Sequence, residues 1–155
     1  MQSKVSSAVV TLVALFAVSL APACASGFDD KTIDQDSINA LQAKILQAQP
    51  RDQCFLYAEL VHEMTELSLR QYSAGDGQKA ASLLKQVQDF AHKIHLGMSD
   101  DNKRLKNAEI LLRHTAFRLN EMLHNSSLDD QPLVAATLAQ VNEAQNEAML
   151  QVFRK

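Results

Sequence analysis

Three segments of the chain place a carboxylate and a histidine three residues apart. They are Glu59-x-x-His62, Asp89-x-x-His92 and Glu121-x-x-His124. On a helix, Glu-x-x-His is the ligand spacing of di-iron and di-manganese bundles, in which two such motifs aim their side chains at one metal pair. The ligands must share a face with the apolar residues, because the metal lies inside the bundle. Whether these motifs can bind metal therefore depends on which face of its helix each motif occupies.

The elements that carry these motifs are predicted to be helices. The 155-residue chain has only four Gly and three Pro, and they fall between long segments with apolar residues at helical spacing. The predicted helices span residues 33–48, 53–73, 78–96, 102–124 and 131 to nearly 155. Thr32 (with Gln35 as a capping-box partner), Asp52 and Asp76 are the expected N-caps, and Gly97 is the expected C-terminal cap.

Two connections, "SAGDGQ" and "HNSSLDDQ", are short enough to fold the flanking helices into hairpins. The predicted fold class is all-α: an antiparallel bundle of two long helical hairpins plus a shorter N-terminal helix, in a single domain at 33–155. Sparse identities at offsets of 50 and 54 residues fit either a duplicated hairpin or chance. "GDGQKAASLLKQV" resembles the second helix of a tetratricopeptide repeat, but the 34-residue period and the aromatic-Gly signature of that repeat are missing.

The second predicted helix carries two adjacent apolar stripes when residues are placed at steps of about 100°. One stripe contains Leu56, Leu60, Met64 and Leu67, and the other contains Cys54, Ala58, Val61, Thr65 and Tyr72. The remaining arc holds Glu59, Glu63, Glu66 and Arg70, with His62 at its margin. We therefore expect Glu59 and His62 to face solvent, and Glu66 to pair with Arg70 one turn later.

The carboxylates and histidines of the other two motifs are also expected to lie away from the apolar faces of their helices. The main stripe of the fourth helix contains Leu105, Ala108, Leu112, Thr115, Ala116, Leu119 and Leu123. Glu121 lies nearly opposite that stripe, His124 lies off it at the helix end, and Asp89 and His92 lie across from the apolar face of the third helix. The pattern argues against a di-metal site, so we predict no metal-binding, catalytic or cofactor-binding residues.

Other residues that could carry chemistry have simpler structural explanations. His92, His95 and Met98 could bind copper or haem, but histidines also interact favourably with the last carbonyls of a helix. Cys54 lies on an apolar face, which suppresses thiol reactivity and favours a buried structural role over an intermolecular disulfide. No Cys-x-x-Cys-His, Gly-x-Ser-x-Gly or Ser-x-x-Lys motif is present. The expectation is a protein that is not an enzyme and has no cofactor.

The first 25 residues have the pattern of a secretory signal peptide. Lys4 precedes an apolar run of about 14 residues, and the small-x-small sequence Ala23-Cys24-Ala25 follows. We expect cleavage after Ala25, a flexible leader at 26–32 and a periplasmic or extracellular location without stable membrane insertion. The alternatives are an uncleaved anchor and lipidation at Cys24, although Pro22 is unfavourable beside a lipoprotein cleavage site.

Charge and surplus apolar residues limit the functional classes. Removing residues 1–25 takes away Lys4 and no acid, so the net charge falls from −3 to −4, which disfavours nucleic acid and anionic lipid. Ile110 and Phe117 lie opposite the main stripe of their helix, and Leu150 and Phe153 lie away from theirs. These residues either complete an irregular core or bind a protein partner or second copy. The predicted function is protein–protein interaction or self-association; the alternative is a bundle that binds a small ligand or metal (copper or haem).

Overall fold

The computed structural model describes residues 33–94 and 102–154, and these ranges contain helices and no strand. The helices are α1 (Gln35–Gln47), α2 (Pro50–Ser73), α3 (Gly77–Ile94), α4 (Asn102–Asn125) and α5 (Gln131–Phe153). The predicted all-α class is therefore confirmed. Within the described ranges, no helix combines the length and apolar content that crossing a membrane requires.

Two predicted helix starts were wrong. The N-cap of α1 is Asp34, whose carboxylate accepts a hydrogen bond from the Ser37 amide at 2.8 Å, while the Ser37 hydroxyl accepts one from the Asp34 amide at 3.1 Å. This reciprocal capping box replaces the one predicted from Thr32. Helix α2 begins at Pro50 rather than after Asp52, because proline at the first turn loses no helical hydrogen bond.

The turn between α2 and α3 agrees with the sequence. Gly75 has a φ of +84°, a conformation that residues with a Cβ rarely adopt, and it lies just past the end of α2. Asp76 then caps α3, because its carboxylate accepts a hydrogen bond from the Lys79 amide at 3.2 Å. The predicted cap at Gly97 lies outside the described residues.

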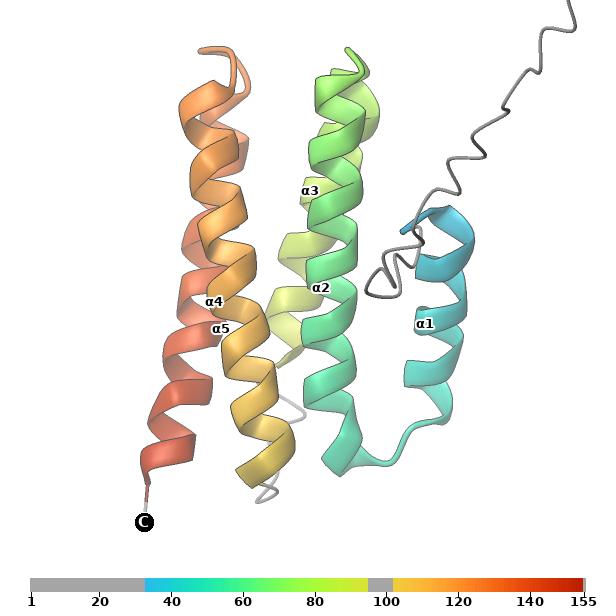
Figure 1. The fold of residues 1–155 in the computed structure, drawn as a ribbon, viewed down its shortest axis with the longest axis vertical. Coiled ribbons are helices and arrows are strands. Elements are labelled where there is room, and N and C mark those ends of the chain that lie inside the picture. Colours follow the sequence, from blue (N-terminus) through green and yellow to red (C-terminus); the bar gives the residue numbers. More distant parts are fainter. Residues whose placement is uncertain (1–32, 95–101, 155) are drawn as a thin grey trace, which may run out of the picture. The chain divides into compact units, whose positions relative to one another are not determined.

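The helices pack as two hairpins with α1 alongside. Helix α2 packs on α3 and α4 on α5, the hairpins meet through α2–α4 and α3–α5, and α1 packs on α2. Figure 1 shows α2 and α4 running in the same direction. The ion pairs Asp52–Arg104 and Glu66–Arg118 agree with this, since each joins residues 52 positions apart. Equivalent helices of the two hairpins are therefore neighbours.

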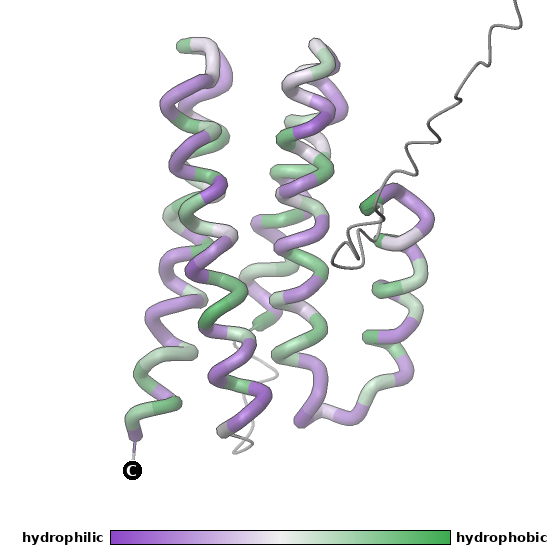
Figure 2. Tube along the Cα trace, viewed as in Figure 1, coloured by the Kyte–Doolittle hydropathy of each residue, from purple (hydrophilic) through white to green (hydrophobic). Residues whose placement is uncertain are grey.

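The core lies between the two hairpins. Apolar and polar residues alternate along each helix at helical spacing, as Figure 2 shows. Leu60 and Met64 of α2, Leu84 of α3, Leu112 of α4 and Val141 of α5 are all buried. Burying a side chain of this size stabilises the fold by about 1.5–3 kcal/mol. Both predicted stripes of α2 are covered because this helix contacts α1, α3 and α4.

Candidate functional site

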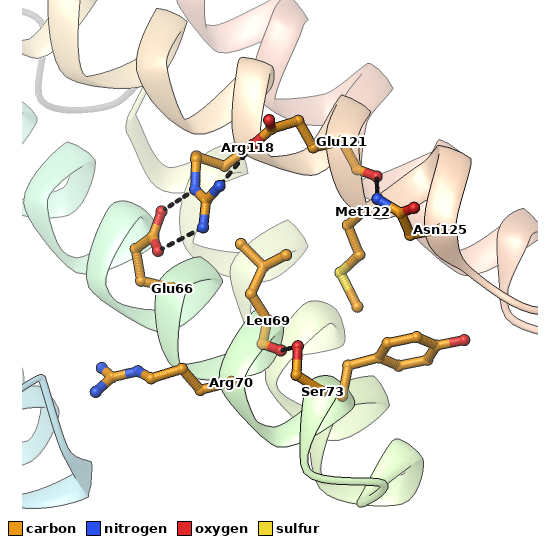
Figure 3. Close-up of a pocket in the computed structure, with 9 residues that line it drawn as sticks. Glu66, Leu69, Arg70, Ser73, Arg118, Glu121, Met122 and Asn125 are labelled. Atoms are coloured by element: carbon orange, nitrogen blue, oxygen red, sulfur yellow. Dashed lines mark hydrogen bonds and ion pairs between the residues drawn. The ribbon is translucent and has the colours of Figure 1, made fainter.

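Polar side chains from α2 and α4 meet along one edge of the contact between these helices. Arg118 donates hydrogen bonds to both carboxylate oxygens of Glu66, at 2.7 and 3.2 Å, and a third to Glu121 on its own helix. These bonds are dashed in Figure 3. The Glu66 hydrogen bond is the main cause that raises the pKa of Arg118, and Glu121 adds to it. We call Glu66, Arg118, Glu121, His62 and Thr115 the α2–α4 seam.

His62 and Thr115 form the second half of the seam, one turn away from Glu66. The Thr115 hydroxyl donates to the Leu111 carbonyl at 2.8 Å, so it accepts the hydrogen bond from Nδ1 of His62 at 3.1 Å. This arrangement favours the Nδ1–H tautomer of His62. Burial lowers the pKa of His62, and the nearby Glu66 carboxylate partly opposes that effect.

This geometry decides what the His–Thr pair does chemically. A histidine activates a hydroxyl nucleophile by accepting its proton. In the Nδ1–H tautomer, Nδ1 of His62 donates to Thr115 and the hydroxyl proton is directed to the Leu111 carbonyl. In that tautomer the pair forms a hydrogen bond between α2 and α4 in which His62 does not accept the hydroxyl proton.

A groove of about 380 Å³ runs beside the seam, with Leu69 and Met122 among its lining residues. Its polar groups bond mainly to the protein itself. Ser73 donates to the Leu69 carbonyl at 2.9 Å, and Asn125 donates to the Glu121 carbonyl at 2.8 Å (Figure 3). Because Arg118 already holds two carboxylates, the groove offers a ligand few uncommitted donors.

The expectation that the acidic arc of α2 is solvated was wrong in three respects. Glu63 is buried, with 5% of its surface exposed. Glu66 pairs with Arg118 of α4 rather than with Arg70, which instead donates to the Ile33 carbonyl. His62 is half-buried rather than solvent-facing. The physical reason is that α1 and α4 approach α2 from the sides of this arc as well as over its apolar stripes.

The remaining motif residues are separate from one another. His124, Asp89 and His92 are exposed, and Glu121 is half-exposed beside Arg118. Within residues 33–94 and 102–154, no three His, Cys, Asp or Glu side chains are grouped closely enough to hold a metal ion. His95 and Met98, considered above for copper or haem, lie outside the described residues.

Cys54 is a buried thiol, as its helical face predicts. Only 3% of its surface is exposed, and burial raises its pKa to about 11. The reactive species is the thiolate, which is scarce when the pKa is this high. The predicted burial of Cys54 on an apolar face is confirmed.

Large apolar side chains remain exposed on the second hairpin. Seven are exposed among the described residues, and five of these lie on α4 or α5: Ile110, Phe117, Met149, Leu150 and Phe153. Of the two alternatives for Ile110 and Phe117, completion of an irregular core does not hold, since 43% and 59% of their surfaces are exposed. They are seven residues apart and therefore share a face of α4.

Sequence reasoning missed Arg118 and the polar role of Thr115. The sequence places Thr115 on the apolar stripe of the fourth helix, but that position reveals no partner on another helix, and no motif singles out Arg118. The usable signal was that Glu66 and Arg118 each border an apolar stripe, where neighbouring helices bring side chains together.

Comparisons with protein-family models, curated proteins and solved structures returned no match.

Proposed function

We propose that this is an exported, non-catalytic helical-bundle protein that acts through contact with protein, either a different partner or a second copy. The observation that carries the proposal is the exposure of Ile110 and Phe117 on one face of α4. Single exposed apolar residues are ordinary, whereas several gathered on one hairpin are typical of an interaction surface. Met149 and Phe153 on α5 belong to the same hairpin.

Export is supported by the sequence order of residues 1–25. The single charge, the apolar run and Ala23-Cys24-Ala25 are the three parts of a secretory signal peptide. We expect the processed chain to begin at Ser26 and to be recovered outside the cytoplasm. Mass spectrometry of the N-terminus measures this directly, and a lipid-modified Cys24 or an intact Met1 would contradict it.

Photo-crosslinking in the native cell tests the interaction. A benzoylphenylalanine at position 117 should give discrete adducts to protein after irradiation, because that side chain is exposed on the proposed face. The matched control places it at Gln86, an exposed position on α3. Protein adducts from 117 but not from 86 are expected. The absence of adducts from positions 117, 110 and 153 would refute the proposal.

A bundle that binds a small ligand or metal is the second candidate. The observation that favours a small ligand is the groove of about 380 Å³ beside Arg118. The test is metal and haem analysis of protein purified without a histidine tag, followed by thermal unfolding with added copper or haem. Stoichiometric metal or haem, or a large saturable rise in Tm, would favour this candidate over protein contact.

A further inference from the structure

The exposed face of α4 carries charged residues in a definite arrangement around its two apolar residues. At about 100° per residue, Lys106, Phe117 and Glu121 all lie within about 40° of Ile110 around the helix. Lys106, Ile110 and Phe117 are exposed, and 43% of the Glu121 side chain is accessible. The same arc also holds Lys103, His114 and His124, which are exposed. The face therefore carries Ile110 and Phe117 at its centre, two lysines towards the N-terminus of the helix and Glu121 towards its C-terminus.

This arrangement is complementary to itself when the helix is reversed. Positions 106 and 121, and positions 110 and 117, are symmetric about one point between Arg113 and His114. A second α4 laid antiparallel about that point brings Ile110 opposite the partner's Phe117. The same operation brings Lys106 opposite the partner's Glu121. Both pairs occur twice, because a two-fold axis repeats each contact.

We propose that α4 is the contact surface of a two-fold homodimer in this antiparallel register. The inference rests on the proposed function of protein contact and names the partner as a second copy of the chain. Two apolar pairs lie near the axis and two ion pairs lie outside them, as in a helix pair with an apolar seam and flanking charges. The parallel alternative sets Lys106 against the partner's Lys106 and Glu121 against the partner's Glu121, which is repulsive.

The charge nearest the axis is compatible with this arrangement. Arg113 lies beside the symmetry point, and its guanidinium is 4.0 Å from the Glu109 carboxylate on the same helix. That pairing reduces repulsion between the two copies of Arg113. A single pair of helices buries less than the roughly 800 Å² per partner of a standard stable interface. We therefore expect a weak dimer in equilibrium with the monomer.

Charge reversal tests the register. Sedimentation velocity of the processed protein across a concentration series should show a monomer–dimer equilibrium. K106E or E121K alone should weaken the dimer by about tenfold or more, because two attractive pairs become two repulsive pairs. The double variant K106E/E121K should return the affinity to near the native value, since it restores opposite charges across the axis. Lys85→Glu, at an exposed position on α3, is the control and should leave the dimer affinity unchanged.

A second variant covers the case in which E121K disturbs the bond to Arg118 and the fold. Phe117→Ser should weaken the dimer by at least about tenfold without changing the helical circular dichroism, because Phe117 is 59% exposed. Leu46→Ser on α1, where the side chain is 86% exposed, is its control. If Phe117→Ser leaves the dimer affinity unchanged, the assigned face is wrong. If K106E weakens the dimer and the double variant K106E/E121K does not restore it, the register is wrong.

Sedimentation and photo-crosslinking together distinguish a homodimer from contact with a different protein. A protein that stays monomeric at all concentrations but crosslinks from position 117 to a different protein contradicts the homodimer and leaves protein contact standing. A monomer that gives no crosslinked adduct from α4 or α5 contradicts both. Homodimeric adducts from position 117, with restoration by the double charge reversal, support both.

Discussion

Arg118→Met should destabilise the protein because it removes one of the ion pairs that join the two hairpins. Methionine keeps much of the apolar stem of arginine, so the substitution mainly removes the charge and its hydrogen bonds. Arg118 makes two bonds to Glu66 on α2 and one to Glu121 on α4. Only the Glu66 bonds cross between the hairpins, so they should carry most of the effect.

The magnitude follows from geometry and exposure. Hydrogen bonds to charged groups contribute about 1.5–3 kcal/mol, whereas exposed ion pairs contribute about 0.2–1 kcal/mol. The Arg118 and Glu66 side chains are 33% and 19% exposed, so the pair lies between these limits. We expect a loss of about 2 kcal/mol in the free energy of unfolding, including the cost of leaving the Glu66 carboxylate without its cation. This corresponds to a fall in Tm of about 8 °C.

Urea unfolding and thermal melts followed by circular dichroism measure the change, and a double-mutant cycle assigns it. The coupling free energy of Arg118 with Glu66 should be about 1.5 kcal/mol, and that with Glu121 about 0.5 kcal/mol. Arg113→Met is the matched control on the same helix, since Arg113 is 64% exposed and 4.0 Å from Glu109. It should cost no more than about 0.5 kcal/mol.

Two results would refute this reasoning. The first is a loss for Arg118→Met no larger than that for Arg113→Met, which would mean that the seam contributes no more than a surface ion pair. The second is a coupling with Glu121 larger than that with Glu66, which would mean that the bond within α4, rather than the bond between hairpins, stabilises the protein.

Three further predictions concern single groups. Burial lowers the folded-state pKa of His62 below the ordinary value of 6.5, so the unfolded chain binds the proton more readily than the folded protein does. The stability contributed by neutral His62 is therefore present above about pH 6.5 and is lost as the pH falls. The loss of stability between pH 7.5 and 5.5 should therefore be smaller in His62→Gln, and an unchanged profile contradicts the assignment. In a Cys24→Ser chain, Cys54 should react with a maleimide only as fast as the protein opens, and rapid labelling of native protein would contradict its burial. Asp34→Ala should lower the local stability of α1 by about 1 kcal/mol in hydrogen exchange, with Asp36→Ala as the control; equal effects would argue against the capping box.

Apart from the starts of α1 and α2, the sequence alone was sufficient to predict the described helices and their main apolar faces. Scarce Gly and Pro, the turn at Gly75 and the cap at Asp76 locate the helix breaks because these are local preferences of the backbone. Helical spacing also identifies Cys54 as buried and places Phe117 opposite the main stripe of its helix, because it depends only on the rotation of each residue around the helix axis.

Only the tertiary structure decided how many neighbours cover each helix. The arc of α2 that holds Glu63 and Glu66 is polar in sequence, but it is flanked by α1 and α4, so Glu63 is buried and Glu66 reaches Arg118. A helical wheel gives the direction of a side chain and not what lies in that direction. The bond from His62 to Thr115, 53 residues away, depends on the parallel packing of α2 and α4, which no local pattern specifies.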